Sequence, residues 1–435
     1  MLPGLSLPVS VTALLAAFRP CFTAPTFETF TGLVAGFLGQ TGRRTVCGML
    51  TGAGLSRLWP HDRAHRFFAG ARWPVDEVCL VLARLVVSLL VPEGEPVRVV
   101  VDDTLFKRSG RKVWAASWFH DGSAKDAKKV GFGNNWVVVG IIVTLPFMTR
   151  PVCLPVMAKL VVKRTTSASR LRLAARAARQ LAEALPGRTI HVVADAAYAG
   201  KELAGLPKNV TWTTRLRKDA ALYDLAPPRT GKRGRPALKG KRLPTLAALA
   251  KTLTFTETTV QRYRKTETVQ IATLTCLWYS VFGPQHVQVI LVKEADGFLL
   301  ALVTTDLTAT PTQVVQRYAS RWSIEVAIED AKQLFGVGEA HNRTAEAVRR
   351  TVPFALACQT LTILWYATAG HHPDDAAEHR TRAPWYQTKT HPSTADMIAK
   401  LRRVFIAARF QAPHPGQPTA TEIHTLRLAW ATEAA

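Results

Sequence analysis

The segment Val97-Arg-Val-Val-Val-Asp-Asp-Thr104 decides how the middle of this 435-residue chain folds. Its valines form the continuous apolar run that is typical of a strand buried on both faces, and the run ends in two carboxylates. Successive strand residues point to opposite faces, so only one of Asp102 and Asp103 should face a given site. The sequence therefore predicts a buried central strand that ends in one functional acidic side chain.

Further periodic stretches follow this strand and predict a mixed α/β core. We expect strands at 136–144, 152–162, 189–194 and 210–215, with a helix at 167–185. Three strands, a helix and a further strand, in that order, form the first half of an RNase H-like fold. A second β-rich stretch at 253–305 and a long helix at 311–334 come next.

This order divides the chain into five expected segments. They are a helical N-terminal domain for DNA binding or dimerisation (1–92), the first half of the core (93–216), a basic linker with a β-rich insertion (217–305), the second half of the core (306–366) and a basic C-terminal tail (367–435). A helical cap on the core is an equally good interpretation of the first segment. The expected fold class is α/β, with an RNase H-like core interrupted by a β-rich insertion and flanked by a helical N-terminal domain and a helical C-terminal tail.

The charge balance points to a polyanionic partner. The chain has 56 Lys and Arg against 31 Asp and Glu, a formal net charge of +25. The longest apolar runs, such as 137–148, are shorter than the roughly 18 residues that indicate a membrane-spanning helix. We therefore expect DNA as the partner and no membrane.

Cysteine usage and the N-terminus indicate a cytoplasmic protein. The six cysteines are dispersed, without a CxxC pair or a Cys/His cluster at zinc spacing, which favours reduced thiols in the core. The apolar N-terminus lacks the basic region of a secretory signal, because its first arginine is Arg19.

Two more acidic residues are candidates for chemistry. Asp195 ends the hydrophobic strand His191-Val-Val-Ala-Asp195, which places it at the sheet edge where ligands bind, although a helix N-cap is its more common role. Glu325 shares an arc of roughly 60° with Tyr318, Arg321 and Lys332 on a helix. The alternative for this face is a solvent-exposed stripe in which Arg321 and Glu325 form an ordinary i,i+4 ion pair.

The spacing Tyr318-x2-Arg321-x3-Glu325-x6-Lys332 resembles the Tyr-Arg-Glu-Lys signature of a group of bacterial insertion-sequence transposases of the DDE type. The resemblance extends over residues 97–365. It includes the mostly β insertion that these enzymes carry before their catalytic glutamate.

Two upstream motifs also match this family. Asp102-Asp103-Thr104 is similar to its Asp-x-Thr strand end, which favours Asp102 over Asp103 as the first catalytic residue. Asp195-Ala-Ala-Tyr198 is similar to its second aspartate, which is often followed by a tyrosine.

The resemblance implies that Asp102, Asp195 and Glu325 are catalytic and bind metal. Carboxylates suit Mg²⁺ (or Mn²⁺), and a pair of ions about 3.5 to 4 Å apart activates the attacking oxygen and stabilises the leaving one. Arg321 and Lys332 would contact backbone phosphate. Tyr318 would stack on a nucleotide or, equally well, pack in the core.

The basic linker adds one further candidate. Arg233-Gly-Arg235-Pro has the form of a hook for the narrow minor groove, while a generic solvated linker that adds phosphate affinity is the simpler interpretation of these two arginines.

The sequence is thus interpreted as a transposase that cleaves DNA and transfers its strands in a bacterial cytoplasm, associated with the nucleoid. Its partners would be double-stranded DNA, as terminal inverted repeats and target, and a second copy of the chain in a homodimer. The alternatives are an RNase H-like endonuclease without joining activity and a non-catalytic DNA-binding protein derived from a transposase. The three intact acids argue against the last.

Overall fold

The valine-rich segment forms β1 (Val97–Lys107), which lies in the middle of one large sheet. Its valines are at most 1% exposed. The strand does not end at Asp102 and Asp103, as the sequence suggested. It continues because Thr104–Lys107 pair with β3 (Val130–Thr144), Thr104 opposite Trp136 and Lys107 opposite Gly133. The two aspartates therefore lie within a strand, where the pairing holds their backbone rigidly.

The computed structural model describes residues 7–122, 129–165, 169–228, 236–262, 265–294, 297–410, 420, 421 and 424. Its sheet has the strand order β2-β3-β1-β5-β6-β10-β9-β8-β7, and β4 pairs with β3. The other strands are β2 (Ser117–His120), β4 (Pro151–Leu160), β5 (Ile190–Ala194), β6 (Val210–Arg215), β7 (Thr256–Arg262), β8 (Lys265–Leu277), β9 (His286–Lys293) and β10 (Leu299–Thr304).

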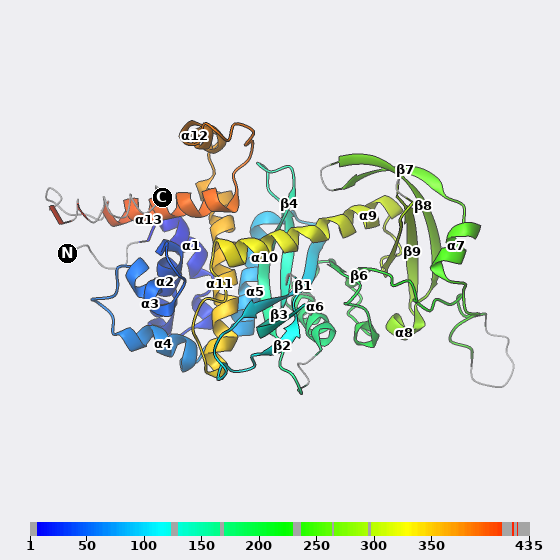
Figure 1. Ribbon diagram of the computed structural model, residues 1–435, viewed down its shortest axis with the longest axis horizontal. Coiled ribbons are helices and arrows are strands. Elements are labelled where there is room, and N and C mark those ends of the chain that lie inside the picture. Colours follow the sequence, from blue (N-terminus) through cyan, green and yellow to red (C-terminus); the bar gives the residue numbers. More distant parts are fainter. Residues whose placement is uncertain are drawn as a thin grey trace.

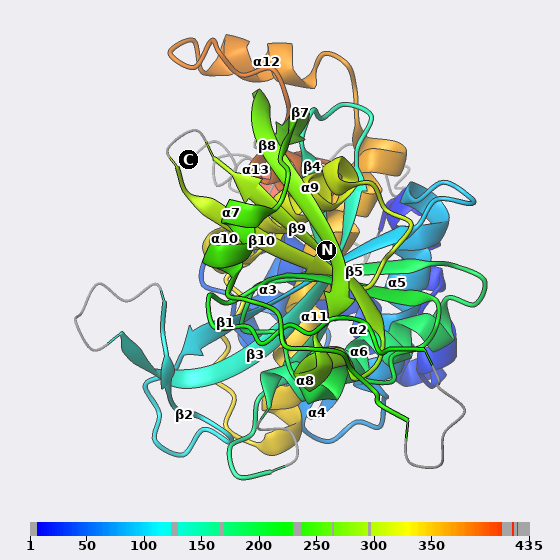
Figure 2. The same ribbon diagram turned by 90° about the vertical axis from the view of Figure 1, so that its right-hand side faces the viewer.

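The second β-rich stretch continues the same sheet. β10 pairs antiparallel with β6, Leu302 opposite Arg215 and Thr304 opposite Thr213, so β7–β10 extend the core sheet on one side (Figure 1). These strands face the viewer in Figure 2. The segment before the long helix is therefore hydrogen-bonded directly to the core.

The helices lie at both ends of the chain and against the sheet (Figure 1). They are α1 (Val9–Ala16), α2 (Ala24–Gly39), α3 (Val46–Gly52), α4 (His61–Ala69), α5 (Val75–Leu90), α6 (Arg170–Ala184), α7 (Leu246–Thr252), α8 (Tyr279–Phe282), α9 (Pro311–Ala319), α10 (Ser323–Gln333), α11 (Ala345–Trp365), α12 (Asp375–Arg382) and α13 (Thr394–Phe410). α13 lies across the N-terminal helices, where Arg402 Nε donates to the Leu38 carbonyl over 2.8 Å.

The helix expected at 311–334 is interrupted. A 3-10 turn at Ser320–Trp322 separates α9 from α10. The Ser320 hydroxyl donates to the Arg317 carbonyl over 2.7 Å, and such bonds back to the preceding turn bend helices. Tyr318 therefore lies on a different helical segment from Glu325 and Lys332.

α11 is the central helix of the core. By length and composition, Ala345–Gly370 is apolar enough to cross a membrane, but 83% of its most apolar window is buried inside the fold. Thr360 and Gln359 are fully buried and donate to the carbonyls of Pro155 (2.6 Å) and Ala327 (2.9 Å). The apolar face of this helix is thus accounted for by packing within the protein.

Aromatic side chains join the N-terminal helices to α11. Phe354 makes edge-to-face contacts with Phe30, Phe37 and Phe68, the last with ring centroids 5.2 Å apart. The Phe354 ring is 3% exposed. The N-terminal helices and the core therefore share one continuous apolar interior.

We predict that Phe354→Ala lowers the free energy of unfolding by about 3 to 5 kcal/mol, because it leaves a cavity between the two regions. Urea denaturation followed by circular dichroism measures this. Phe298→Ala is the control, since its ring is 44% exposed and its loss should cost less than about 1 kcal/mol. Equal losses for the two variants would show that the aromatic contact does not join the regions.

Candidate active site

The strand register brings two of the candidate acids side by side. β1 and β5 run parallel, with Val101 opposite Ala194, and Asp102 and Asp195 directly follow these partners. Neighbouring strands lie about 4.8 Å apart. The Asp195 carboxylate also accepts the backbone N–H of Ala197 over 2.8 Å, the local turn bond that an aspartate at a strand end commonly makes.

Arg321 connects the third acid to this pair. Its Nη1 lies 3.3 Å from Asp102 Oδ2 and its Nη2 lies 2.7 Å from Glu325 Oε1. The Arg321 side chain is 16% exposed, that of Asp102 20% and that of Glu325 34%. One half-buried guanidinium thus holds the helix-borne glutamate next to the strand-borne aspartate, which an isolated i,i+4 pair on a solvent-exposed face would not do.

Burial dominates the electrostatics of Asp102. It raises the pKa of this carboxyl from 3.8 to about 6, with smaller increases from the charges of Asp195 and Asp103. The Asp103 N–H and Arg321 act in the opposite direction but do not cancel the effect of burial. A positive charge added near Asp102 would therefore stabilise the ionised form of its carboxyl group.

Asp103 has partners of its own. Arg170 Nε, from α6, lies 2.9 Å from Asp103 Oδ2, and Asn135 Nδ2 donates to the same oxygen over 3.0 Å. The Tyr198 hydroxyl donates to Asp103 Oδ1 over 3.2 Å. Burial, followed by the charges of Asp103, Asp102 and Asp195, raises the pKa of this phenol well above 10. Asp103 is thus held by α6 and β3, while Asp102 contacts Arg321 in the 3-10 turn before α10.

Sequence reasoning missed the support that Arg170 and Tyr198 provide. Tyr198 is 1% exposed, and its backbone carbonyl accepts the indole N–H of Trp212 over 3.1 Å. Its position after Asp195 in the motif was the only signal in the sequence. No signal in the sequence distinguished Arg170 from the other arginines of α6.

Tyr318 lies at the edge of the site and is partly buried against the apolar cluster that α9 forms with the β7–β10 strands. Arg321 lies 5.9 Å from its ring centroid. The Tyr318 ring therefore packs against this apolar cluster and stays close to Arg321.

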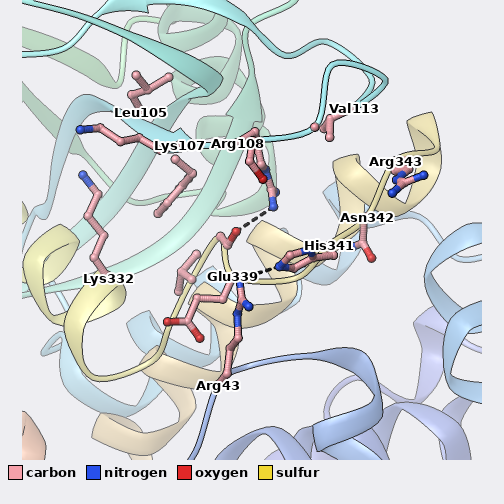
Figure 3. Close-up of a pocket in the computed structure, with 15 residues that line it drawn as sticks. Arg43, Leu105, Lys107, Arg108, Val113, Lys332, Glu339, His341, Asn342 and Arg343 are labelled. Atoms are coloured by element: carbon pink, nitrogen blue, oxygen red, sulfur yellow. Dashed lines mark hydrogen bonds between the residues drawn. The ribbon is translucent and has the colours of Figure 1, made fainter.

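Lys332 lies further along α10, in a basic pocket (Figure 3). The pocket has a volume of about 460 Å³. The side chains of Lys332 and Lys107 converge at their amino ends in Figure 3. Burial, followed by the charge of Lys107, lowers the pKa of Lys332 against the opposing effect of Asp121. The other basic side chains that line the pocket are Arg43, Arg108, His341 and Arg343.

The pocket is built from three separate chain segments. Arg108 Nη1 donates to the carbonyls of Gly338 (2.7 Å) and Ala340 (2.6 Å), and Arg43 Nη2 lies 2.6 Å from His341 Nε2. Sequence reasoning found only Lys332, since these residues meet only after folding. The linker candidates Arg233 and Arg235 lie outside the described residues.

The residues present suit a divalent cation. Asp102 on β1, Asp195 directly after β5 and Glu325 on α10 are carboxylates, and carboxylate oxygens are the ligands that Mg²⁺ and Mn²⁺ prefer. Asp102 and Asp195 directly follow paired residues of adjacent strands, and Arg321 connects Glu325 to Asp102.

We predict that Asp102→Asn stabilises the protein at pH 8 without divalent metal, by up to about 2 kcal/mol. Because the folded pKa is raised, wild-type stability falls as pH rises from about 4 to about 6 on account of this group. The variant lacks this fall, so the difference should vanish at pH 4. Denaturation midpoints across pH measure it.

Asp103→Asn is the matched control and should destabilise the protein, because Arg170 loses its carboxylate partner. A difference between wild type and Asp102→Asn that does not change with pH would contradict the raised pKa of Asp102.

Comparisons with known proteins indicate the family to which the chain belongs. A family model described as DDE superfamily endonuclease matches residues 17–275, a region that includes Asp102 and Asp195 and ends before Glu325. No curated protein matches significantly. Among solved structures, the chain is similar to a piggyBac transposase synaptic complex with hairpin DNA, at 12% identity and a TM-score of 0.42, over 98% of this chain and 81% of that one. A likeness at that level carries no argument, whereas the family model covers more than half of the chain. The protein belongs to the DDE superfamily endonuclease family.

Proposed function

We propose that this endonuclease is an insertion-sequence transposase that cleaves DNA at the ends of its element and transfers the strands to a target. The observation that carries the proposal is the contact of Arg321 with both Asp102 and Glu325, beside Asp195 on the adjacent strand. It supports a shared site for the three acids of the transposase-like motifs.

The topology supports an RNase H-like core for this activity. The strands β4-β3-β1-β5-β6 are neighbours in that order, the first three antiparallel and the last two parallel to β1, with α6 between β4 and β5. This is the arrangement expected from three strands, a helix and a further strand. In the proposed domain layout, β7–β10 are an insertion between the two halves of the core.

The proposed metal ligands are Asp102, Asp195 and Glu325, holding two Mg²⁺ or Mn²⁺ ions. When bound, such ions activate the attacking oxygen and stabilise the leaving oxygen of a phosphodiester. Asp102 is ionised above its pKa of about 6 and is then available as a ligand. Arg321 is a positioning residue that keeps Glu325 over the sheet.

The basic pocket supports a path for the DNA backbone. Lys332 lies seven residues after Glu325 on α10, so it points to a similar side of the helix about two turns away. Lys107 and Arg108 follow Asp102 on the sheet side. Phosphates that approach the carboxylates would meet these cations first, and Arg233 and Arg235 would add phosphate affinity.

The proposed partners are double-stranded DNA and a second copy of the chain, in a bacterial cytoplasm next to the nucleoid. The net charge of +25 supports the DNA partner. An endonuclease that cuts without joining is the rival, and a strand-transfer assay on a pre-cut DNA end separates the two.

We predict that Asp102→Asn, Asp195→Asn and Glu325→Gln each lower cleavage and strand transfer together by at least about 100-fold, while DNA binding stays near wild type. Labelled terminal DNA incubated with Mg²⁺ and resolved on a gel shows nicked, excised and joined products. Glu329→Gln is the matched control, because Glu329 is exposed on the same helix. Wild-type cleavage by Glu325→Gln would remove that residue from the site.

Binding to the basic pocket has its own signature. Lys332→Ala and Lys107→Ala should weaken binding to all duplexes and reduce the slope of log affinity against log salt by about one each. Lys251 is exposed on α7, at the far end of the molecule (Figure 1). Lys251→Ala should leave the DNA affinity and its salt dependence unchanged. An effect confined to one DNA sequence would mean base recognition instead of phosphate contact.

A further inference from the structure

A second group of potential metal ligands lies in the N-terminal helices, away from the carboxylates. Cys47 Sγ lies 3.3 Å from His61 Nε2 and 3.6 Å from His65 Nε2. The sulfur and one nitrogen from each imidazole all lie within 4.8 Å of one another. The two imidazole rings have their centroids 4.6 Å apart.

The helices place these side chains together. His61 and His65 are four residues apart on α4 and therefore share one face. Cys47 comes from the first turn of α3, which packs on α4. The dispersed cysteines of the sequence predicted only core thiols and no Cys/His cluster, and the packing of α3 on α4 overturns this prediction. Cys47 is exposed, in contrast to the five buried cysteines, and only the packing of α3 on α4 brings it to the histidines.

The separations fit a tetrahedral zinc ion. With Zn–S near 2.3 Å and Zn–N near 2.0 to 2.1 Å, the sulfur-to-nitrogen edge of the tetrahedron is about 3.5 Å long. The two observed separations, 3.3 and 3.6 Å, lie on either side of that value. A thiolate with two imidazoles is a ligand set that favours zinc over Mg²⁺, Mn²⁺ or Ca²⁺.

We propose that Cys47, His61 and His65 bind one Zn²⁺ ion, which links α3 to α4. Cys47 and His61 are exposed and His65 is half-buried, so an ion reaches the site from solvent. The nearest acidic neighbour in the sequence, Asp62, pairs with Arg66, and the part of the chain that the structure describes contributes three ligands. A solvent molecule completes the coordination, and the Cys47 thiol loses its proton when the ion binds.

Co²⁺ is the probe, because its spectrum reports the ligands. The chelator-treated full-length protein, titrated without oxygen, should take up one equivalent with a thiolate-to-cobalt charge-transfer band and the strong visible bands of four-coordinate Co²⁺. Zn²⁺ should then displace it and abolish these bands. Ions bound at the carboxylates have oxygen ligands only and give no charge-transfer band.

Variants assign the site. Cys47→Ser should lose the charge-transfer band, and His65→Asn should weaken Co²⁺ binding by at least about tenfold. Asp195→Asn, in the candidate active site, and His286→Gln, an exposed histidine on β9, should keep the wild-type spectrum and affinity. Circular dichroism of each metal-free variant checks that it is folded.

Two results would overturn the proposal. One is Co²⁺ uptake without a charge-transfer band in the folded wild-type protein, and the other is a band that persists in Cys47→Ser. Either would leave the close contacts as hydrogen bonds between a thiol and two imidazoles. Loss of the carboxylate-dependent activity would have no effect on this outcome, because the two sites share no ligand.

Discussion

The ion pairs of Arg321 hold the candidate active site together. This half-buried guanidinium contacts Asp102 in the middle of the sheet and Glu325 on α10, so it connects two elements that are more than 200 residues apart in the chain. Buried charges are costly unless they are paired, and removing one partner leaves the others uncompensated. This contact holds the start of α10 near the sheet, together with the buried side chains of Ile324, Ala327 and Ala331 on the same helix.

The surroundings of Asp102 keep several acidic side chains close together in a partly buried part of the fold. Strand pairing holds Asp102 next to Asp195, while Asp103 is held by Arg170, Asn135 and Tyr198. Burial keeps the pKa of Asp102 near 6 even though Arg321 lies beside it. The folded protein is less stable when Asp102 is ionised, and a cation bound at this carboxylate would restore that stability. This property suits a metal-dependent nuclease.

Local patterns in the sequence predicted much of the secondary structure. The valine run at 97–101, the strand at Val210–Arg215 and the helix at Arg170–Ala184 all depend on side-chain periodicity over a few residues. One prediction was wrong where hydrogen bonds to a distant segment decide the outcome. β1 continues past its aspartates because β3 pairs with it. A local cause interrupts the helix expected at 311–334, where a 3-10 turn at Ser320–Trp322 separates α9 from α10.

The sequence by itself determined the α/β class, the basic charge and the motifs that contain the three candidate acids, because these features are read from neighbouring residues. Only the tertiary structure decided which residues meet. The pocket around Lys332 draws on three distant segments, and the Cys47 cluster forms where α3 packs on α4. Both depend on contacts between segments far apart in the chain, so the i,i+4 spacing of His61 and His65 alone could not have indicated that Cys47 lies beside them.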